Sequence, residues 1–257
     1  MTQKTRAEAF AALHQPGTPL VLYNCWDAGS AAAIAQAGAP ALATGSWSVA
    51  VAQGYSDGED LPMTALFDTA KRITATTELP VSVDFEGGYA TDPAALSENI
   101  KGLLTTGAVG LNFEDRVVSE GKGLHPLQTQ VSRIQAIRAT AEAQDLPLYI
   151  NARTDVFLQA APETHAAHFD EAARRVAAYV EAGASGVFVP GLTDPELIKR
   201  MVAHVQAPVN VLCLDVTADI SPLAALGVAR ISFGPAPYRA AMKALSAEAA
   251  RHYESPS

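Results

Sequence analysis

The sequence predicts an α/β protein built as one (β/α)8 barrel of the TIM type, a single domain over residues 1–257. Short runs rich in Val, Ile and Leu alternate with longer Ala-rich stretches of helical period, which is typical of βα units around a parallel sheet. About eight such runs occur, and eight strands close a barrel. The length also suits one barrel, and no Pro- or Ser-rich linker divides the chain.

The apolar runs predict the strands, at Leu20–Asn24, Pro40–Ala43, Val81–Asp84, Val109–Phe113, Leu148–Asn151, Gly186–Val189, Val209–Leu212 and Ala229–Ser232. Helices are expected between them, at about 28–37, 64–78, 93–106, 127–144, 163–182, 194–204, 219–226 and 236–252. Asp92-Pro93 and Asp194-Pro195 each place a capping side chain before a first-turn proline.

A glycine turn recurs before at least four of the predicted strands, at Gly38, Gly107, Gly183 and Gly227. Such a turn ends a helix and leads into a strand. An open, doubly wound sheet uses the same βα units, but this even repeat favours the barrel. The loops at about 44–62, part of which can be helical, and about 116–126 are too long for simple connections. Both follow strands, so we expect them to be lids over the active face.

Composition excludes several classes of protein. A hydrophobic fraction of 49% with 18% charged residues excludes a disordered chain, and a formal charge of −9 gives no basic surface for nucleic acid or an anionic membrane. The first residues show no apolar signal region and no later stretch is long and apolar, so cytoplasm is expected. Cys25 and Cys213 are too few for a disulfide scaffold or zinc cluster, and we expect them to pack as small buried residues.

Carboxylates follow two successive strands, and an arginine follows the third. Asp84 and Glu86 come after the first of these strands, Glu114 after the next and Arg153 after the one beyond. Strand ends of a parallel barrel open onto one face, so these groups should meet in one pocket. Together with Asp57, the carboxylates predict a Mg²⁺ site, because clustered carboxylates repel unless a cation neutralises them.

Arg153 is expected to bind a substrate carboxylate, the alternative being a structural ion pair with Glu114 or Asp155. The segment Gly45-Ser46-Trp47 could offer backbone N–H groups to the same anion. On the second loop, Lys122 and His125 are candidate acid/base residues, although residues in such positions are often simply solvated.

Ordered motifs make the chain resemble the isocitrate lyase/phosphoenolpyruvate mutase superfamily from about Leu20 to Gly234. The motifs are Asn24-Cys-Trp-Asp27, Gly45-Ser-Trp-Ser48, Gly54-Tyr-Ser-Asp57, Val83-Asp-Phe-Glu-Gly-Gly-Tyr89, Asn112-Phe-Glu-Asp115 and Asn151-Ala-Arg-Thr-Asp155. The resemblance implies a (β/α)8 barrel whose last helix is exchanged with a neighbouring subunit, in a homotetramer built as a dimer of dimers.

The resemblance also implies a site and a chemistry. Mg²⁺ would lie near Asp84, with Asp57, Glu86 and Glu114 reaching it directly or through water. Gly45, Ser46, Trp47 and Arg153 would bind a 2-oxo carboxylate. The expected reaction is cleavage of a C–C bond in a small 2-oxo or 2-hydroxy di- or tricarboxylate through a pyruvate-like enolate.

Two departures from the superfamily pattern keep the exact reaction open. Residues 119–125 contain no cysteine, whereas the isocitrate-type lyases carry one there as proton donor, and Val189-Pro190-Gly191 stands where the mutases carry a histidine. A hydrolase or decarboxylase of oxaloacetate- or phosphonopyruvate-type substrates, and a non-catalytic 2-oxo acid binding protein, are the alternatives.

Overall fold

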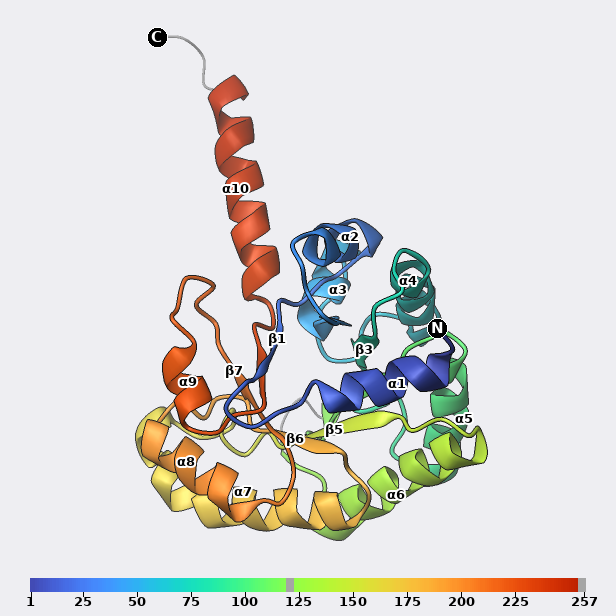
Figure 1. Ribbon diagram of the computed structural model, residues 1–257, viewed down its shortest axis with the longest axis vertical. Coiled ribbons are helices and arrows are strands. Elements are labelled where there is room, and N and C mark those ends of the chain that lie inside the picture. Colours follow the sequence, from blue (N-terminus) through green and yellow to red (C-terminus); the bar gives the residue numbers. More distant parts are fainter. Residues whose placement is uncertain (119–122, 254–257) are drawn as a thin grey trace.

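In the computed structural model, which describes residues 1–118 and 123–253, eight parallel strands form one sheet that curves into a nearly closed barrel (Figure 1). The strands are β1 (Leu20–Leu22), β2 (Leu42–Ala43), β3 (Val81–Asp84), β4 (Gly110–Glu114), β5 (Tyr149–Arg153), β6 (Gly186–Phe188), β7 (Val209–Leu212) and β8 (Arg230–Ser232). The order around the sheet is β1-β8-β7-β6-β5-β4-β3-β2. The (β/α)8 fold expected from the sequence is therefore confirmed.

The gap between β1 and β2 is spanned just beyond the strand ends. Cys25 and Thr44 form a parallel bridge there, and the Cys25 N–H donates to the Ala43 carbonyl at 2.9 Å. The Cys25 side chain is fully buried, and burial raises the pKa of its thiol to about 12. Cys25 is thus a packing residue, as the sequence suggested.

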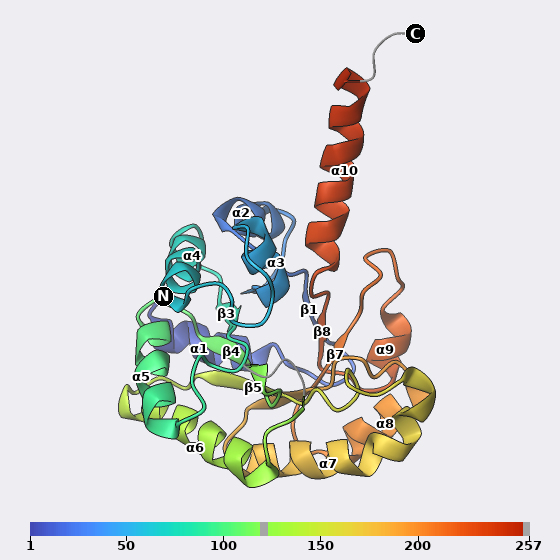
Figure 2. The ribbon, with the colours of Figure 1, turned by 180° about the vertical axis from the view of Figure 1, so that it is seen from behind.

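The helices are α1 (Gln3–Ala12), α2 (Ala28–Gln36), α3 (Ser46–Ala52), α4 (Met63–Ala75), α5 (Pro93–Leu104), α6 (Leu127–Ala143), η2 (Pro162–Thr164), α7 (His165–Glu181), α8 (Pro195–His204), α9 (Ser221–Ala225) and α10 (Ala236–Tyr253). Figures 1 and 2 show α5 to α8 as a continuous outer layer. Asp92 and Asp194 cap α5 and α8 as expected. The four turn glycines all have positive φ, between 86° and 105°, which explains why glycine recurs there.

The sequence did not predict α1, because its apolar pattern is short. Only Ala7 and Phe10 of this helix are buried. The Phe10 ring meets Tyr149, the first residue of β5, at 5.4 Å between centroids, so α1 packs across the end of the barrel where the strands begin. The opposite end, where the strands finish, carries the long loops.

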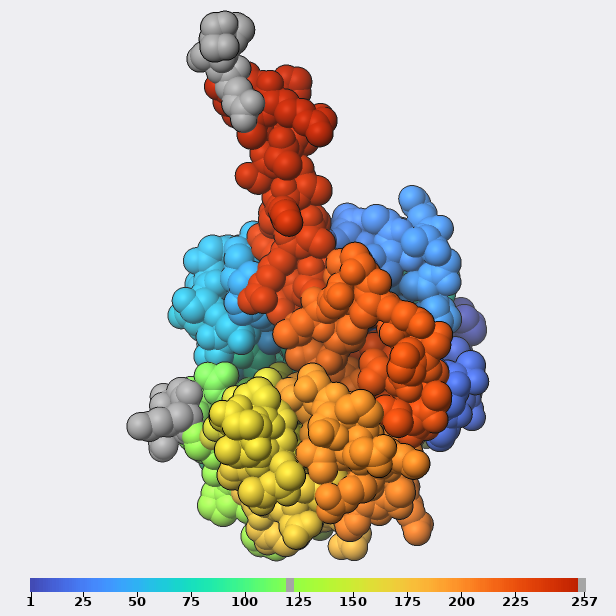
Figure 3. Space-filling model, turned by 90° about the vertical axis from the view of Figure 1, so that its left-hand side faces the viewer, coloured from blue at the N-terminus to red at the C-terminus, as the bar shows by residue number. Residues whose placement is uncertain are grey.

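Helix α10 projects away from the barrel (Figure 3). Within it only Ala236 and Pro237 are buried, whereas Leu245 is 62% exposed. The expected exchange of this helix with a second subunit stays a prediction. No helix in residues 1–118 and 123–253 has both the length and the apolar character needed to cross a membrane.

Candidate active site

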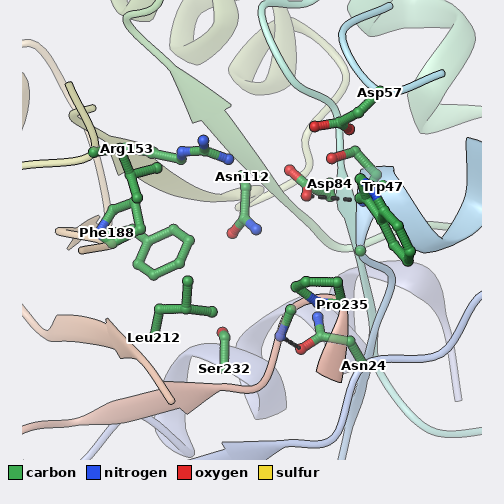
Figure 4. Close-up of a pocket in the computed structure, with 15 residues that line it drawn as sticks. Asn24, Trp47, Asp57, Asp84, Asn112, Arg153, Phe188, Leu212, Ser232 and Pro235 are labelled. Carbon is green, nitrogen blue, oxygen red and sulfur yellow. Dashed lines mark hydrogen bonds between the residues drawn. The ribbon is translucent and has the colours of Figure 1, made fainter. Parts of the chain in front are cut away.

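A cavity of about 180 Å³ opens at the carboxyl ends of the strands (Figure 4). The last residues of β3, β5, β6, β7 and β8 all line it, namely Asp84, Arg153, Phe188, Leu212 and Ser232. The remaining lining residues are Asn24, Gly45, Ser46, Trp47, Asp57, Asn112, Leu158, Pro190, Gly234 and Pro235. The barrel therefore brings together side chains that lie far apart in the sequence, as a parallel barrel should.

Asp84 has one carboxylate oxygen that lacks a partner. Its Oδ2 accepts a hydrogen bond from the Ser46 N–H at 3.0 Å, and its own N–H donates to the Thr44 hydroxyl at 2.9 Å. Oδ1 is buried and accepts no hydrogen bond from the described residues. A buried carboxylate oxygen without a partner is costly, so this atom fits a bound cation.

Asp57 lies beside Asp84 at the cavity, and the two carboxylates face each other in Figure 4. Although Asp57 is an exposed residue, loss of water around its carboxyl and the neighbouring Asp84 carboxylate raise its pKa. The pKa of Glu86 is raised further, to about 8, by burial and by the charges of Asp57 and Asp84. This excess of negative charge is what a divalent cation would relieve.

Glu86 and Glu59 hold two loops together reciprocally. Glu86 Oε2 accepts hydrogen bonds from the N–H groups of Gly58 and Glu59, both at 2.9 Å, and Glu59 Oε1 accepts one from Tyr89 N–H at 2.8 Å. Glu59, Glu86 and Tyr89 all have positive φ, which costs non-glycine residues about 1–3 kcal/mol each. The contacts position the loop that carries Asp57 against the end of β3.

Arg153 makes both contacts that the sequence offered as alternatives to substrate binding. Its Nη1 lies 2.8 Å from Glu114 Oε2, and its Nε and Nη2 donate to Asp155 at 2.5 and 2.8 Å. Burial would lower the pKa of Arg153, but the two carboxylates outweigh it and raise that pKa. These contacts use three of the five guanidinium N–H groups, and two remain for a ligand in the cavity that Arg153 lines.

Asp115 holds the segment that follows Arg153 in place. It is fully buried and accepts hydrogen bonds from the hydroxyls of Thr154 and Tyr179, both at 2.7 Å, and from the Asp155 N–H at 2.9 Å. The sequence singled out the motif that contains Asp115 but gave this residue no role. The reason is that Glu114 is the last residue of β4, where a pocket residue is expected, whereas Asp115 lies one residue beyond the strand.

Amides form the floor of the cavity. Asn112 Oδ1 accepts hydrogen bonds from Asn151 Nδ2 at 2.8 Å and Arg230 Nη2 at 3.2 Å, which leaves the Asn112 NH₂ group to donate into the cavity. Asn24 Oδ1 accepts from the N–H groups of Phe233 and Gly234 at 2.9 and 2.8 Å. These bonds fix the amide orientations that a ligand would meet.

Some of the remaining predicted site residues line the cavity and others do not. Trp47 lines the cavity, but the Ser46 N–H is taken by Asp84 and the Gly45 N–H donates to the Cys25 carbonyl at 3.3 Å, so neither amide is free for an anion in this structure. Glu86 and Glu114 stand behind the cavity rather than on its wall.

Of the two predicted acid/base residues, Lys122 lies outside the described residues. His125 is buried in a separate hollow together with Glu59, Arg116 and Arg133. Burial and the charges of Arg133 and Arg175 lower the pKa of His125. A catalytic role for His125 would therefore need it to reach the neighbouring cavity, and that role stays a prediction.

A metal ion fits this site if one or two carboxylates hold it and water or substrate supplies the other ligands. Among residues 1–118 and 123–253, no three His, Cys, Asp or Glu side chains converge closely enough to hold an ion between them. Mg²⁺, however, is usually held by one or two carboxylates with water and substrate oxygens completing its shell. The unpartnered Asp84 Oδ1, with Asp57 beside it, suits that manner of binding.

Phe188, Leu212 and Ser232 were missed by the sequence reasoning. An apolar residue at the end of an apolar run looks like the core, and a serine there carries no distinctive signal. Their one available signal was position, because each is the last residue of its strand.

Comparison with known proteins agrees with the fold. The family model of phosphoenolpyruvate phosphomutase matches residues 10–253. An uncharacterised protein of Mycobacterium tuberculosis is 34% identical over 244 residues, covering 95% of this chain and 88% of its own. The 2-methylisocitrate lyase of Escherichia coli is 29% identical over 216 residues, covering 81% of this chain and 70% of the enzyme.

A solved structure from Burkholderia cenocepacia, described as a candidate phosphonomutase, has TM-score 0.94 and 45% identity, covering 97% of this chain and 99% of that chain. The chain belongs to the phosphoenolpyruvate phosphomutase family, within the isocitrate lyase/phosphoenolpyruvate mutase superfamily.

Proposed function

We propose that this protein is a Mg²⁺-dependent lyase that cleaves a C–C bond of a small 2-oxo or 2-hydroxy carboxylate through a pyruvate-like enolate. The observation that carries the proposal is the pairing, in one cavity, of an unpartnered Asp84 oxygen with an arginine that keeps two N–H donors. A 2-oxo acid would use both groups, because a cation at Asp84 would bind its 2-oxo oxygen and Arg153 would bind its carboxylate.

Asp84 would hold Mg²⁺ directly, with Asp57, Glu86 and Glu114 acting through water. Bound there, the ion would supply positive charge for the developing enolate oxygen. Arg153 would bind the carboxylate of the substrate, and Glu114 and Asp155 would hold its guanidinium plane in place. Such fixed positive charge stabilises the transition state because little reorganisation is needed during the reaction.

The proton that the reaction moves is assigned to the loop of residues 116–126, through Lys122 or His125. That loop contains no cysteine, which favours as second candidate the decarboxylation or hydrolysis of an oxaloacetate-type substrate, whose small enolate product could take its proton from water. One relative, from Chromohalobacter salexigens, is an oxaloacetate decarboxylase. The third candidate is a 2-oxo acid binding protein without turnover.

A turnover screen separates these candidates. The purified protein is incubated with oxaloacetate, 2-methylisocitrate, 2,3-dimethylmalate or phosphonopyruvate, with Mg²⁺ or with EDTA, and the products are identified by mass spectrometry. Cleavage of 2-methylisocitrate or 2,3-dimethylmalate into a 2-oxo acid and a second carboxylic acid supports the lyase, whereas release of CO₂ or acetate from oxaloacetate, or of phosphate from phosphonopyruvate, supports the second candidate. Binding of 2-oxo acids with no turnover of any substrate favours the binding protein.

We further propose that the protein works in the cytoplasm and as a homo-oligomer, in which α10 packs on a second subunit. The exposed length of α10 supports this assembly.

A further inference from the structure

The walls of the active-site cavity are divided by strand. The strands β3 and β5 end in the charged lining residues Asp84 and Arg153, whereas β6 and β7 end in the apolar lining residues Phe188 and Leu212. In the order of the sheet β7 lies four places from β3, on the far side of the barrel. Figure 4 shows Phe188 and Leu212 close together across the cavity from Asp57 and Asp84.

The apolar side extends beyond these two residues. Pro190 follows β6 and lines the cavity, as does Leu158 from the loop after β5. Phe188 and Pro190 are buried, and Leu212 is half-buried. A ligand that reaches from Asp84 towards β7 would therefore exchange water for hydrocarbon at its far end.

Positive charge in the cavity comes from the end of β5, where Arg153 is the register neighbour of Phe188. Of the described residues that line it, Arg153 is the single cationic side chain, and it already faces Glu114 and Asp155. With Arg153 occupied by the 2-oxo acid carboxylate, a second carboxylate or a phosphonate placed against Phe188 and Leu212 would lose its water without gaining a counter-charge of its own, which is strongly unfavourable. An alkyl group in the same place would gain by burial.

We infer that the substrate carries an alkyl group at the end that faces β6 and β7, and that Phe188 and Leu212 determine this specificity. This inference rests on the proposed function, because it assumes that the 2-oxo acid end binds at Asp84 and Arg153. The sequence led us to expect a di- or tricarboxylate substrate. The inference narrows this substrate class to acids whose second anionic group, where present, lies away from Phe188 and Leu212.

Binding of 2-oxo acids tests the inference, with phosphonopyruvate, which is also a candidate substrate, checked by mass spectrometry for turnover. Calorimetry with Mg²⁺ present compares pyruvate, 2-oxobutyrate, 2-oxovalerate and 2-oxohexanoate with 2-oxoglutarate and phosphonopyruvate. We expect each of the first added methylenes to lower Kd about fourfold, in line with the burial of one CH₂ group. We expect 2-oxoglutarate and phosphonopyruvate to bind at least about tenfold more weakly than 2-oxovalerate.

The variant Leu212→Lys should reverse this preference, because it places a cation on the apolar side. Leu214→Lys is the matched control, since Leu214 is 57% exposed and does not line the cavity. Leu212→Ala, a smaller change, should weaken the binding of 2-oxovalerate several-fold more than the binding of oxalate, and retained oxalate binding shows that the variant is folded.

Oxalate separates the two possible failures, because it has the 2-oxo acid end and no tail. If oxalate does not bind with Mg²⁺, the proposed function is wrong. If oxalate binds but Kd does not change along the alkyl series, or 2-oxoglutarate binds as tightly as 2-oxovalerate, the apolar side does not contact substrate and the inference is overturned.

Discussion

Glu114 and Arg153 are paired residues at the ends of adjacent strands, and their side chains form an ion pair of 2.8 Å. Asp155 holds the same guanidinium from the other side at 2.5 Å. The arginine is thus fixed by two carboxylates before any ligand arrives, and its two remaining N–H groups are available to a ligand in the cavity that Arg153 lines. Arg153 can therefore form a structural ion pair and bind a ligand at the same time.

Arg153→Lys should weaken binding of 2-oxo acids by about 10- to 100-fold, because hydrogen bonds to charged groups contribute about 1.5–3 kcal/mol and a lysine cannot keep the forked contact with Asp155. Calorimetric titration with oxalate and Mg²⁺ measures the change. Arg174→Lys serves as control, since Arg174 is exposed and pairs with Glu171 on the surface of α7. Unchanged affinity in Arg153→Lys would show that Arg153 is purely structural.

Asp84→Asn should abolish Mg²⁺-dependent binding and turnover, with a loss of at least about 100-fold. The amide oxygen can still accept the hydrogen bond from Ser46, so the fold should persist. In EDTA the melting temperature should be equal to or above that of the wild type, because the repulsion with Asp57 is removed. Mg²⁺ dependence that survives in this variant would contradict the metal assignment.

Stability of the metal-free protein should depend on pH through Glu86. Burial and the charges of Asp57 and Asp84 raise its pKa from 4.5 to about 8, so the folded chain holds this proton more tightly than the unfolded chain. The free energy of unfolding should therefore fall as pH rises from about 4.5 to about 8. Urea titrations in EDTA at several pH values measure it, and Mg²⁺ should restore stability at the upper end.

For this pH effect Glu86→Gln is the informative variant, because its amide oxygen can keep the bonds to Gly58 and Glu59 while the titration is lost. The fall in the free energy of unfolding between about pH 4.5 and about pH 8 should become smaller in Glu86→Gln. It should stay unchanged in Glu78→Gln, which alters an exposed residue. An identical slope in both variants would assign the pH dependence to other groups.

Helix α10 should mediate assembly. Because Leu245 is 62% exposed on a helix that leaves the barrel, Leu245→Asp should reduce the oligomer measured by sedimentation velocity. Lys243→Asp, two residues earlier and also exposed, introduces the same side chain and should have a smaller effect. A wild-type monomer at micromolar concentration would rule out the proposed assembly.

The sequence was sufficient for the barrel because its signals are local and repeated. Apolar runs mark the strands, and the glycine turns at positive φ mark the ends of the helices. Asp84 and Arg153 were found for the same reason, since a charged residue directly after an apolar strand stands out. α1 escaped because its two buried residues form no clear period.

Other properties of the site depend on tertiary contacts that no local pattern shows. The pairing of Glu59 with the loop after β3 joins segments 30 residues apart, and the burial of Asp115 depends on Tyr179, 64 residues away. The apolar side at Phe188 and Leu212 is likewise visible only once β6 and β7 are placed opposite β3.

The most direct test of the account is titration of the wild-type protein and Asp84→Asn with oxalate, each with Mg²⁺ and with EDTA. The account predicts binding in the wild type that requires Mg²⁺, and no binding in the variant under either condition. Oxalate binding that is equally tight in EDTA, or that survives Asp84→Asn, would contradict a metal-dependent 2-oxo acid site between Asp84 and Arg153.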